Sequence, residues 1–454
     1  MEKTQQRKES SSYTAVSMNL LKAIWKDKDL RKKCLITLLI LTVCKLLSSI
    51  PTPGVNPDYF KLMMQNNSAL GFLNSLTGNG LSRLSIATLS ISPFITASII
   101  FQLLCVIFPK LQEIQKGHEK HQERKREAIL LLTGVAMSLL QSITMSIGFG
   151  RTGLLLNYKW YVILGVSLTW TLTSTFIYAL GLVITKKFIG SGMSLILLMN
   201  ILSSYPSDAF SVWVVLLKGK DFAVFAVTLI AIIAVIVALF IFTILLQECE
   251  KRIVVNYSGK LSQKGSSKAT NIIPLKLCPG GVVPIIFASS LITFPVMIFG
   301  AFGKTDSHII RLLNPNQWFN ANYPIYTLGA LLYCLLIFGF AYFYTEITFN
   351  PIEVANNIQK AGGTISGIRP GKSTAEYLRS QMKYMIAIGA IALCFIALLP
   401  MVISGTLGLN NLSFLGTSII ITVGVILETK KLLETKTHGS IYMNRINKGG
   451  LFRA

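Results

Sequence analysis

Residues 222–247 read FAVFAVTLIAIIAVIVALFIFTILLQ and contain no charged side chain. A helix needs about 20 mainly apolar residues to cross a hydrocarbon core of roughly 30 Å, and this stretch is long enough. Of the 454 residues, 52% are hydrophobic and only 14% are charged, too few polar side chains to coat a soluble protein of this size. The sequence therefore predicts an all-α membrane protein.

Ten apolar stretches in all qualify as membrane spans. They lie at 34–50, 84–107, 127–149, 160–185, 192–205, 222–247, 281–300, 324–345, 382–403 and 410–427. The fifth is short for a span and Pro93 interrupts the second, so both depend on pattern more than on length. The spans divide the chain into a tail (1–33), a first half (34–205), a second half (206–427) and a second tail (428–454).

Lysine and arginine are unevenly distributed between the two sides that ten spans create. Most of the 43 Lys and Arg fall in the two tails and the even-numbered connections. Basic residues near helix ends are retained on the cytoplasmic side, so we expect both termini in the cytoplasm. Residues 1–33 lack an apolar core and a cleavage site, and we expect them to stay on the chain. The net charge of +24 reflects this topology, and also suits docking of acidic partners, including ribosomal RNA.

Three connections are unusual. The outer segment 51–81 is moderately apolar and rich in Gly and Asn, which indicates a re-entrant segment; a surface loop is the alternative. Irregular backbone at membrane depth is tolerated where it is buried in protein or lines a water-filled cavity. The inner loops 248–280 and 346–379 are long, basic and rich in turn residues, and loops of that kind are commonly functional.

The cysteines and histidines predict neither a metal site nor a cofactor site. Seven cysteines form no CxxC pair and are interpreted as packing residues. His118 and His121 could share a helical face, but no third ligand accompanies them. We expect no cofactor, no metal and no enzymatic activity.

Other classes of membrane protein are disfavoured by what the spans lack. Secondary transporters generally carry ionisable residues within their spans, and no Asp or Glu lies in the middle of any of the ten. Lys45 is near enough to the outer end of its span to reach the interface. A phosphate-binding loop ending in Gly371-Lys372-Ser373 would need glycine at position 366, which is serine, so an ATPase is disfavoured. A passive scaffold stays open on composition alone.

Short motifs along almost the whole chain resemble those of the SecY/Sec61-alpha family, in the family's order. They are IPTPGVN (50–56), ISPFITASIIFQLL (91–104), GSGMSLI (190–196), IPLK (273–276), VPIIFASS (283–290), NP (350–351), GIRPGK (367–372) and GTSIII (416–421). The resemblance implies two inverted five-helix halves around a central pore, with a plug segment at about 66–82. It also implies the central pore-forming subunit of the Sec translocase, a protein-conducting channel that passes unfolded secretory proteins and releases membrane-protein segments sideways.

The same resemblance implies roles for particular residues. A narrow apolar waist gates by dewetting, and i, i+4 pairs share a helix face, so aliphatic pairs suit a pore ring. The ring positions are Ile91, Ile95, Met193, Leu197, Ile286 and Ile421. The plug includes Leu70, Gly71, Phe72, Leu73 and Asn74, and polar residues of the lateral gate are Ser98, Gln102 and Gln141. Each ring residue taken alone would be interpreted as packing or lipid-facing, and polar residues between helices are common glue.

The implied partners are SecE, SecG, the ATPase SecA, the ribosome, membrane lipid and precursors bearing signal sequences. Arg252 and Arg369 match the family's basic docking positions, and arginine pairs bidentately with phosphate or carboxylate. The second inner loop, GHEKHQERKR (117–126), and the end of the chain depart from the family pattern. They leave open an accessory paralogue devoted to a few substrates. The expected location is the bacterial cell membrane, with a plastid membrane as the alternative.

Overall fold

The computed structural model describes residues 28–56, 74, 76–117, 119–150, 155, 157–214, 222–257, 271–301, 308–315, 318–319, 324–407 and 415–448. The chain forms two compact units. The first comprises Met1–Phe60, Asn74–Ser204 and Val425–Ala454, and the second comprises Lys61–Leu73 and Tyr205–Gly424. Each unit is described separately below.

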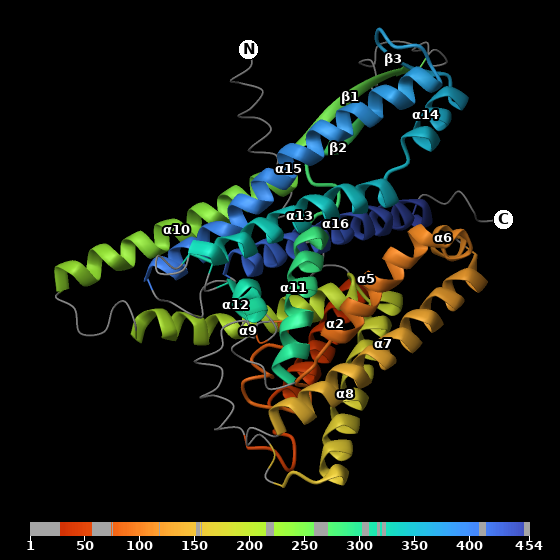
Figure 1. The fold of residues 1–454 in the computed structure, drawn as a ribbon. Helices are drawn as coiled ribbons and strands as arrows, with labels where there is room; N and C mark the ends of the chain where they lie inside the picture. Colours follow the sequence, from red (N-terminus) through yellow and green to blue (C-terminus); the bar gives the residue numbers. More distant parts are fainter. Residues whose placement is uncertain are drawn as a thin grey trace. The chain divides into compact units, whose positions relative to one another are not determined.

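The described residues are mostly helical (Figure 1). Helices of the first unit are α2 (Lys28–Leu47), α5 (Ser92–Ile107), α6 (Pro109–Lys116), α7 (Lys120–Phe149) and α8 (Trp160–Lys187). Helices α9 (Gly192–Val212) and α16 (Leu415–Lys448) contain residues of both units. The second unit contains α10 (Phe222–Glu248), α11 (Val283–Ala301), α12 (His308–Leu313), η5 (Pro324–Tyr326), α13 (Thr327–Thr348), α14 (Pro351–Lys360) and α15 (Lys372–Leu407).

A helix lies on each of the ten predicted spans. Among the described residues, five helical stretches are long and apolar enough to cross a membrane: Lys120–Gly148, Trp160–Lys187, Phe225–Glu248, Pro324–Lys360 and Lys372–Ile403. Helix α10 leaves many large apolar side chains exposed, among them Val227, Ile230 and Leu245. Such a surface needs lipid or protein against it. The chain is a multi-pass membrane protein, while the number of ten spans stays a prediction.

Several helix ends differ from the hydropathy boundaries. Helix α5 begins at Ser92 rather than at 84, because Leu84 and Ser90 have positive φ angles of 46° and 45° that no α-helix accommodates. Pro93 then stands in the first turn, where its missing N–H costs nothing. Helix α15 starts at Lys372 rather than at 382, and α16 continues to Lys448 rather than ending at 427. Lys, Glu and Leu favour a helix without being apolar throughout.

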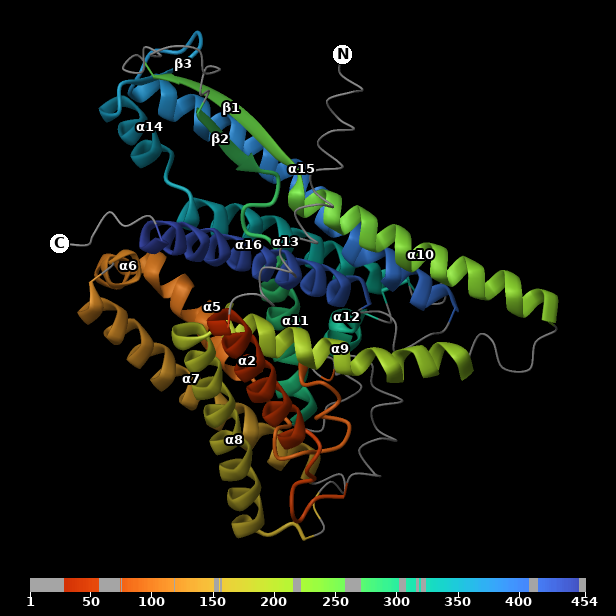
Figure 2. The same ribbon diagram turned by 180° about the vertical axis from the view of Figure 1, so that it is seen from behind.

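The first unit is built around the hairpin of α5, α6 and α7, with α8 packed on α7 (Figures 1 and 2). Phe94 of α5 stacks on Tyr178 of α8, with ring centroids 4.1 Å apart. Gly134 of α7 faces Phe94 so closely that a Cβ there would lie 2.2 Å from the ring. These contacts fix the position of α5 between its neighbours.

The second unit contains a small antiparallel sheet that the sequence did not predict. Strand β1 (Glu250–Tyr257) pairs with β2 (Asn271–Lys276) and with β3 (Gly363–Ile365), in the order β2-β1-β3. One face packs against α14 and α15 through a cluster that includes Ile253, Val255, Leu275, Ile365, Ile358, Leu378 and Met382. Alternate residues of β1 are buried, as expected of a strand covered on one side. The two inner loops are therefore joined as one folded element, which we call the sheet region: β1, β2, β3, α14 and the start of α15.

Candidate functional site

Two of the predicted ring residues lie at the start of α5. Ile91 is the residue before the helix, and its carbonyl accepts from the N–H groups of Phe94 and Ile95. Its side chain is fully buried, and that of Ile95 is 9% exposed. One helical turn separates them, so both side chains lie on one face of α5.

Two more predicted ring residues lie on α9 in the same unit. Leu197 is buried, while Met193 is half-buried. The helix starts at Gly192, where a Cβ would lie 1.9 Å from the carbonyl oxygen of Gly181 in α8. Only glycine permits this approach, which brings the beginning of α9 against α8.

The remaining two predicted ring residues lie in the second unit. Ile286 stands in the first turn of α11 and is 7% exposed, and Ile421 of α16 is fully buried. The Gln247 side chain of α10 donates from Nε2 to the carbonyl of Ile420, 3.1 Å away, which fixes the backbone beside Ile421. The six side chains are all apolar, and their membership of one ring stays a prediction.

A polar network that the sequence did not predict surrounds the α5 and α9 positions. Asn200 of α9 is 4% exposed and donates from Nδ2 to the Leu76 carbonyl (2.8 Å) and to Ser90 Oγ (3.0 Å). The Ser90 carbonyl in turn accepts from Ser174 Oγ of α8 at 2.6 Å. In the sequence, this network could have been suspected from an asparagine within an apolar span, since a buried amide requires hydrogen-bond partners.

Lys45 does not extend toward an interface as expected. Its ammonium donates to the Gly78 carbonyl at 2.7 Å and to Ser203 Oγ of α9. Gly78 itself has a φ of +64° and lies against the backbone of Asn200, which leaves no room for a side chain. The lysine is thus an internal tie between α2, the turn around Gly78 and α9.

The predicted plug falls mostly outside the described residues. Leu70, Gly71, Phe72 and Leu73 are not described, and Asn74 is. The Asn74 amide donates to Asn79 Oδ1 (2.8 Å), and its Oδ1 accepts from the Ser82 N–H (2.9 Å). Asn74 therefore closes a turn in the second part of the predicted plug segment.

The three predicted lateral-gate residues do not form one cluster. Gln102 donates to Ser98 Oγ one turn earlier in α5 (3.2 Å), and its Oε1 is buried without a partner among the described residues. Gln141 lies in α7, which runs antiparallel to α5 through the α6 hairpin. Phe94 of α5 faces Gly134 of α7. Because the two helices are antiparallel, the chain leads from this pair to Gln102 in one direction and to Gln141 in the other. At 1.5 Å per residue, the two glutamines lie roughly 20 Å apart along the helices.

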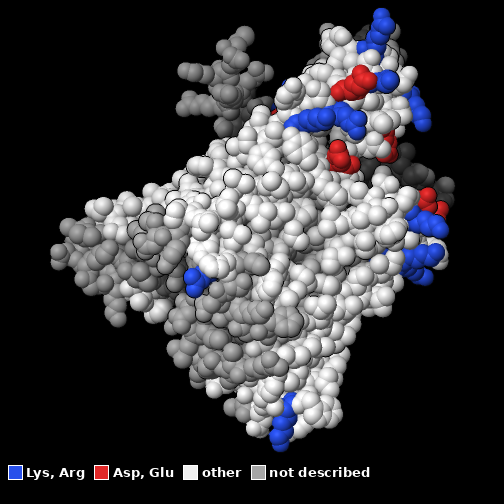
Figure 3. All heavy atoms as spheres, in the orientation of Figure 1, with Lys and Arg blue, Asp and Glu red and all other residues white. Residues whose placement is uncertain are grey.

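The two predicted docking arginines lie in the sheet region. Arg252 on β1 is half-exposed, and its Nε lies 3.2 Å from Glu250 Oε1. Arg369 is exposed in a turn between two glycines with positive φ, Gly367 (80°) and Gly371 (98°), and its carbonyl accepts from Thr374 Oγ1 at 2.9 Å. Figure 3 shows Lys and Arg interspersed with Asp and Glu over the sheet region. The fold thus holds Arg369 on a turn beside a surface that carries charges of both signs.

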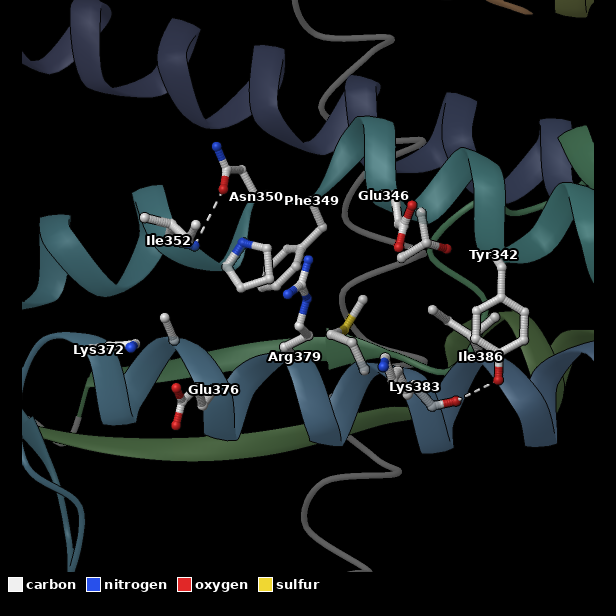
Figure 4. Close-up of a pocket in the computed structure, with 14 residues that line it drawn as sticks. Tyr342, Glu346, Phe349, Asn350, Ile352, Lys372, Glu376, Arg379, Lys383 and Ile386 are labelled. Atoms are coloured by element: carbon white, nitrogen blue, oxygen red, sulfur yellow. Dashed lines mark hydrogen bonds between the residues drawn. The ribbon is translucent and has the colours of Figure 1, made fainter. Parts of the chain in front are cut away.

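A cavity of about 390 Å³ lies between α13, α14 and α15 in the second unit (Figure 4). Phe349, Met382 and Ile386 provide apolar walls. The charged lining residues are Glu346, Lys372, Glu376, Arg379 and Lys383. Because both signs of charge line it, its electrostatics select neither an anion nor a cation. Among the described residues, no group of three or more His, Cys, Asp or Glu side chains could hold a metal ion.

Curated relatives resemble this chain over almost its whole length. The protein translocase subunit SecY of Synechocystis sp. is 32% identical over 92% of this chain and 95% of its own. That of Halalkalibacterium halodurans is 34% identical over 91% and 96%, and that of Helicobacter pylori is 33% identical over 92% and 98%.

Solved structures share the fold. A protein-conducting channel superposes with a TM-score of 0.60 at 18% identity, covering 88% of this chain and 90% of that chain. Sec61 in the canine ribosome-channel complex from the endoplasmic reticulum gives a TM-score of 0.57 at 18% identity, with the same coverage. The sequence model of the SecY family matches residues 85–430. With relatives above 30% identity along nearly the full length, the chain belongs to the SecY family.

Proposed function

We propose that the chain is the pore-forming subunit of a protein translocase, which conducts unfolded secretory proteins across the membrane and releases apolar segments sideways into it. The observation that carries this proposal is the near-full-length identity of 32–34% to relatives named protein translocase subunit SecY. The transport is passive with respect to this chain. It performs no covalent chemistry and uses no cofactor.

The gate would be formed by apolar side chains. The proposed ring residues are Ile91, Ile95, Met193, Leu197, Ile286 and Ile421. Their apolar character supports the proposal, because a narrow apolar constriction empties of water and blocks ions at rest. The segment at about 66–82 would act as the plug. The absence of Asp and Glu from the middle of the spans supports a channel over an ion-coupled transporter.

The lateral exit would be bordered by the second and seventh spans and by the third and eighth, with α5 as the second span and α7 as the third. Ser98, Gln102 and Gln141 would provide polar positions along that seam at different depths. The unpartnered Oε1 of Gln102 supports this role, since an acceptor left free inside the protein is available to a neighbouring helix.

The sheet region docks the partner that supplies energy, either SecA or the ribosome. Arg369 on its fixed turn and Arg252 on β1 would contact acidic side chains or phosphates, which arginine binds with a planar fork. SecE and SecG complete the complex. Both termini would lie in the cytoplasm, which the distribution of Lys and Arg supports. The chain would reside in the bacterial cell membrane.

Depletion of the protein in its own cells tests the proposal. A general loss of export of signal-bearing precursors is expected, and loss of only one or a few surface proteins would instead identify an accessory paralogue. Reconstituted vesicles provide the second measurement. Proton or sodium flux that depends on a small-molecule substrate, without precursor translocation, would refute the channel.

A further inference from the structure

Asn200 is a buried polar side chain three residues after the predicted ring residue Leu197. It lies in α9, is 4% exposed, and donates from Nδ2 to two acceptors on the preceding part of the chain. One acceptor is the Leu76 carbonyl, in a turn whose residues Leu76 and Leu81 are themselves buried. A buried amide that satisfies a backbone carbonyl in this way fixes the distance between the two segments, because either group alone would be left unpaired.

The second acceptor fixes where α5 begins. Ser90 precedes Ile91 and has a φ of 45°. Its carbonyl accepts a hydrogen bond from Ser174 Oγ of α8 at 2.6 Å. Its hydroxyl accepts from Asn200 at 3.0 Å. The start of α5 is thus hydrogen-bonded on one side to α8 and on the other to α9.

Both ends of the Asn200–Ser90 bond adjoin predicted ring residues. Ser90 is the residue before Ile91, and Asn200 comes three residues after Leu197, so it lies on the same side of α9. Ile91 and Leu197 are both buried. A second tie stands one turn further along α9, where Ser203 shares the Lys45 ammonium with the Gly78 carbonyl.

We propose that Asn200 is a positioning residue that sets the spacing between α5 and α9, and thereby holds the Ile91 and Leu197 side chains in the closed arrangement of the ring. The inference rests on the proposed function, because it concerns a channel that must stay sealed at rest. Asn200 contacts no transported chain in this role. It acts through Ser90 and the Leu76 turn.

The test compares purified channels with Asn200→Leu and Ser90→Ala in planar bilayers, measuring ion conductance at rest, together with export of a precursor whose signal sequence is defective. Leucine keeps the branched shape of asparagine and removes both donors. Ser90→Ala removes one acceptor and leaves the carbonyl that binds Ser174. Loss of one buried hydrogen bond shifts a two-state equilibrium by about tenfold, so resting conductance is expected to rise about tenfold.

Two controls make the result interpretable. Ser142→Ala removes a buried hydrogen bond to Thr171 (3.1 Å) that joins α7 to α8, neither of which carries a ring residue, and its resting conductance should match wild type. Ile91→Asn tests the ring directly and should leak. If Asn200→Leu does not accumulate, Ser90→Ala alone decides.

The outcomes separate the two proposals. A leak with Ile91→Asn and wild-type conductance with Asn200→Leu and Ser90→Ala would overturn the positioning role and leave the ring intact. Wild-type conductance in all variants would overturn the ring and the positioning role with it. An equal leak from Ser142→Ala would show general loosening and would also overturn the positioning role.

Discussion

Replacing Ile91 with asparagine tests whether Ile91 is a gate residue or an ordinary core residue. The Ile91 side chain is fully buried at the start of α5. Removing it sacrifices about 2 kcal/mol of apolar burial. An amide placed there without partners costs about another 2 kcal/mol. The closed arrangement should therefore lose about 4 kcal/mol, which corresponds to roughly a thousandfold change in the ratio of closed to open channels if the open arrangement hydrates the amide.

The assay is resting ion conductance in planar bilayers, combined with export of precursors that have defective signal sequences. Both should rise in Ile91→Asn. The matched control is Ile177→Asn, because Ile177 of α8 is 1% exposed and belongs to no predicted ring. That variant should lose similar stability, seen as a lower midpoint of thermal unfolding in detergent, without a leak. Equal conductance in the two variants would refute the assignment of Ile91 to a gate.

Three further predictions concern the sheet region and its surroundings. Arg369→Glu should reduce SecA-driven translocation at least tenfold, since reversing a charge that is buried in the docked complex costs several kcal/mol. Lys360→Glu, on the exposed end of α14, should leave translocation unchanged. Equal activity of the two variants would contradict the docking role of Arg369. Val255→Asp should destabilise the sheet by about 3 kcal/mol, because Val255 is 1% exposed in the apolar cluster between the sheet and helices α14 and α15. Limited proteolysis should then cleave near β1. An unchanged digest would contradict the packing of Val255 in this cluster. Burial raises the pKa of the Cys278 thiol to about 12, so almost none of Cys278 is thiolate at pH 8. Maleimide should therefore label the exposed Cys249 in the native protein, and label Cys278 only after denaturation. Equal labelling of both in the native protein would show that Cys278 is accessible.

The sequence predicts the positions of the helices better than their ends. Apolar windows found α10 within a residue at each end, because apolar residues run along almost its whole length. They missed the first turns of α15 and the last turns of α16, where polar residues with high helix propensity continue the helix. They also placed the start of α5 too early, because hydropathy does not detect the positive φ angles at Leu84 and Ser90.

The sheet and the polar network were missed for a different physical reason. The alternation of buried and exposed residues in β1 is short, and it lies in a loop whose lysines and arginines dominate its composition. Its partner β3 is more than 100 residues away, and a pairing of that kind cannot be read from local pattern. The hydrogen bonds of Asn200 could not be predicted for the same reason, since its acceptors at Leu76 and Ser90 lie 124 and 110 residues earlier in the chain.

The length of α15 has a mechanical consequence. The helix runs from Lys372 to Leu407 and contains Pro400, which interrupts its hydrogen-bond ladder near the far end. The part before the proline, residues 372–399, forms a rod of about 42 Å. Its first turns are packed into the sheet region, and its later turns contact α10 and α13. A partner that displaces the sheet region by about 5 Å would tilt such a rod by roughly 7° about its far end. The proposed docking surface and the apolar part of the second unit thus belong to one lever, and a push on the first would be delivered to the second without any intervening loop.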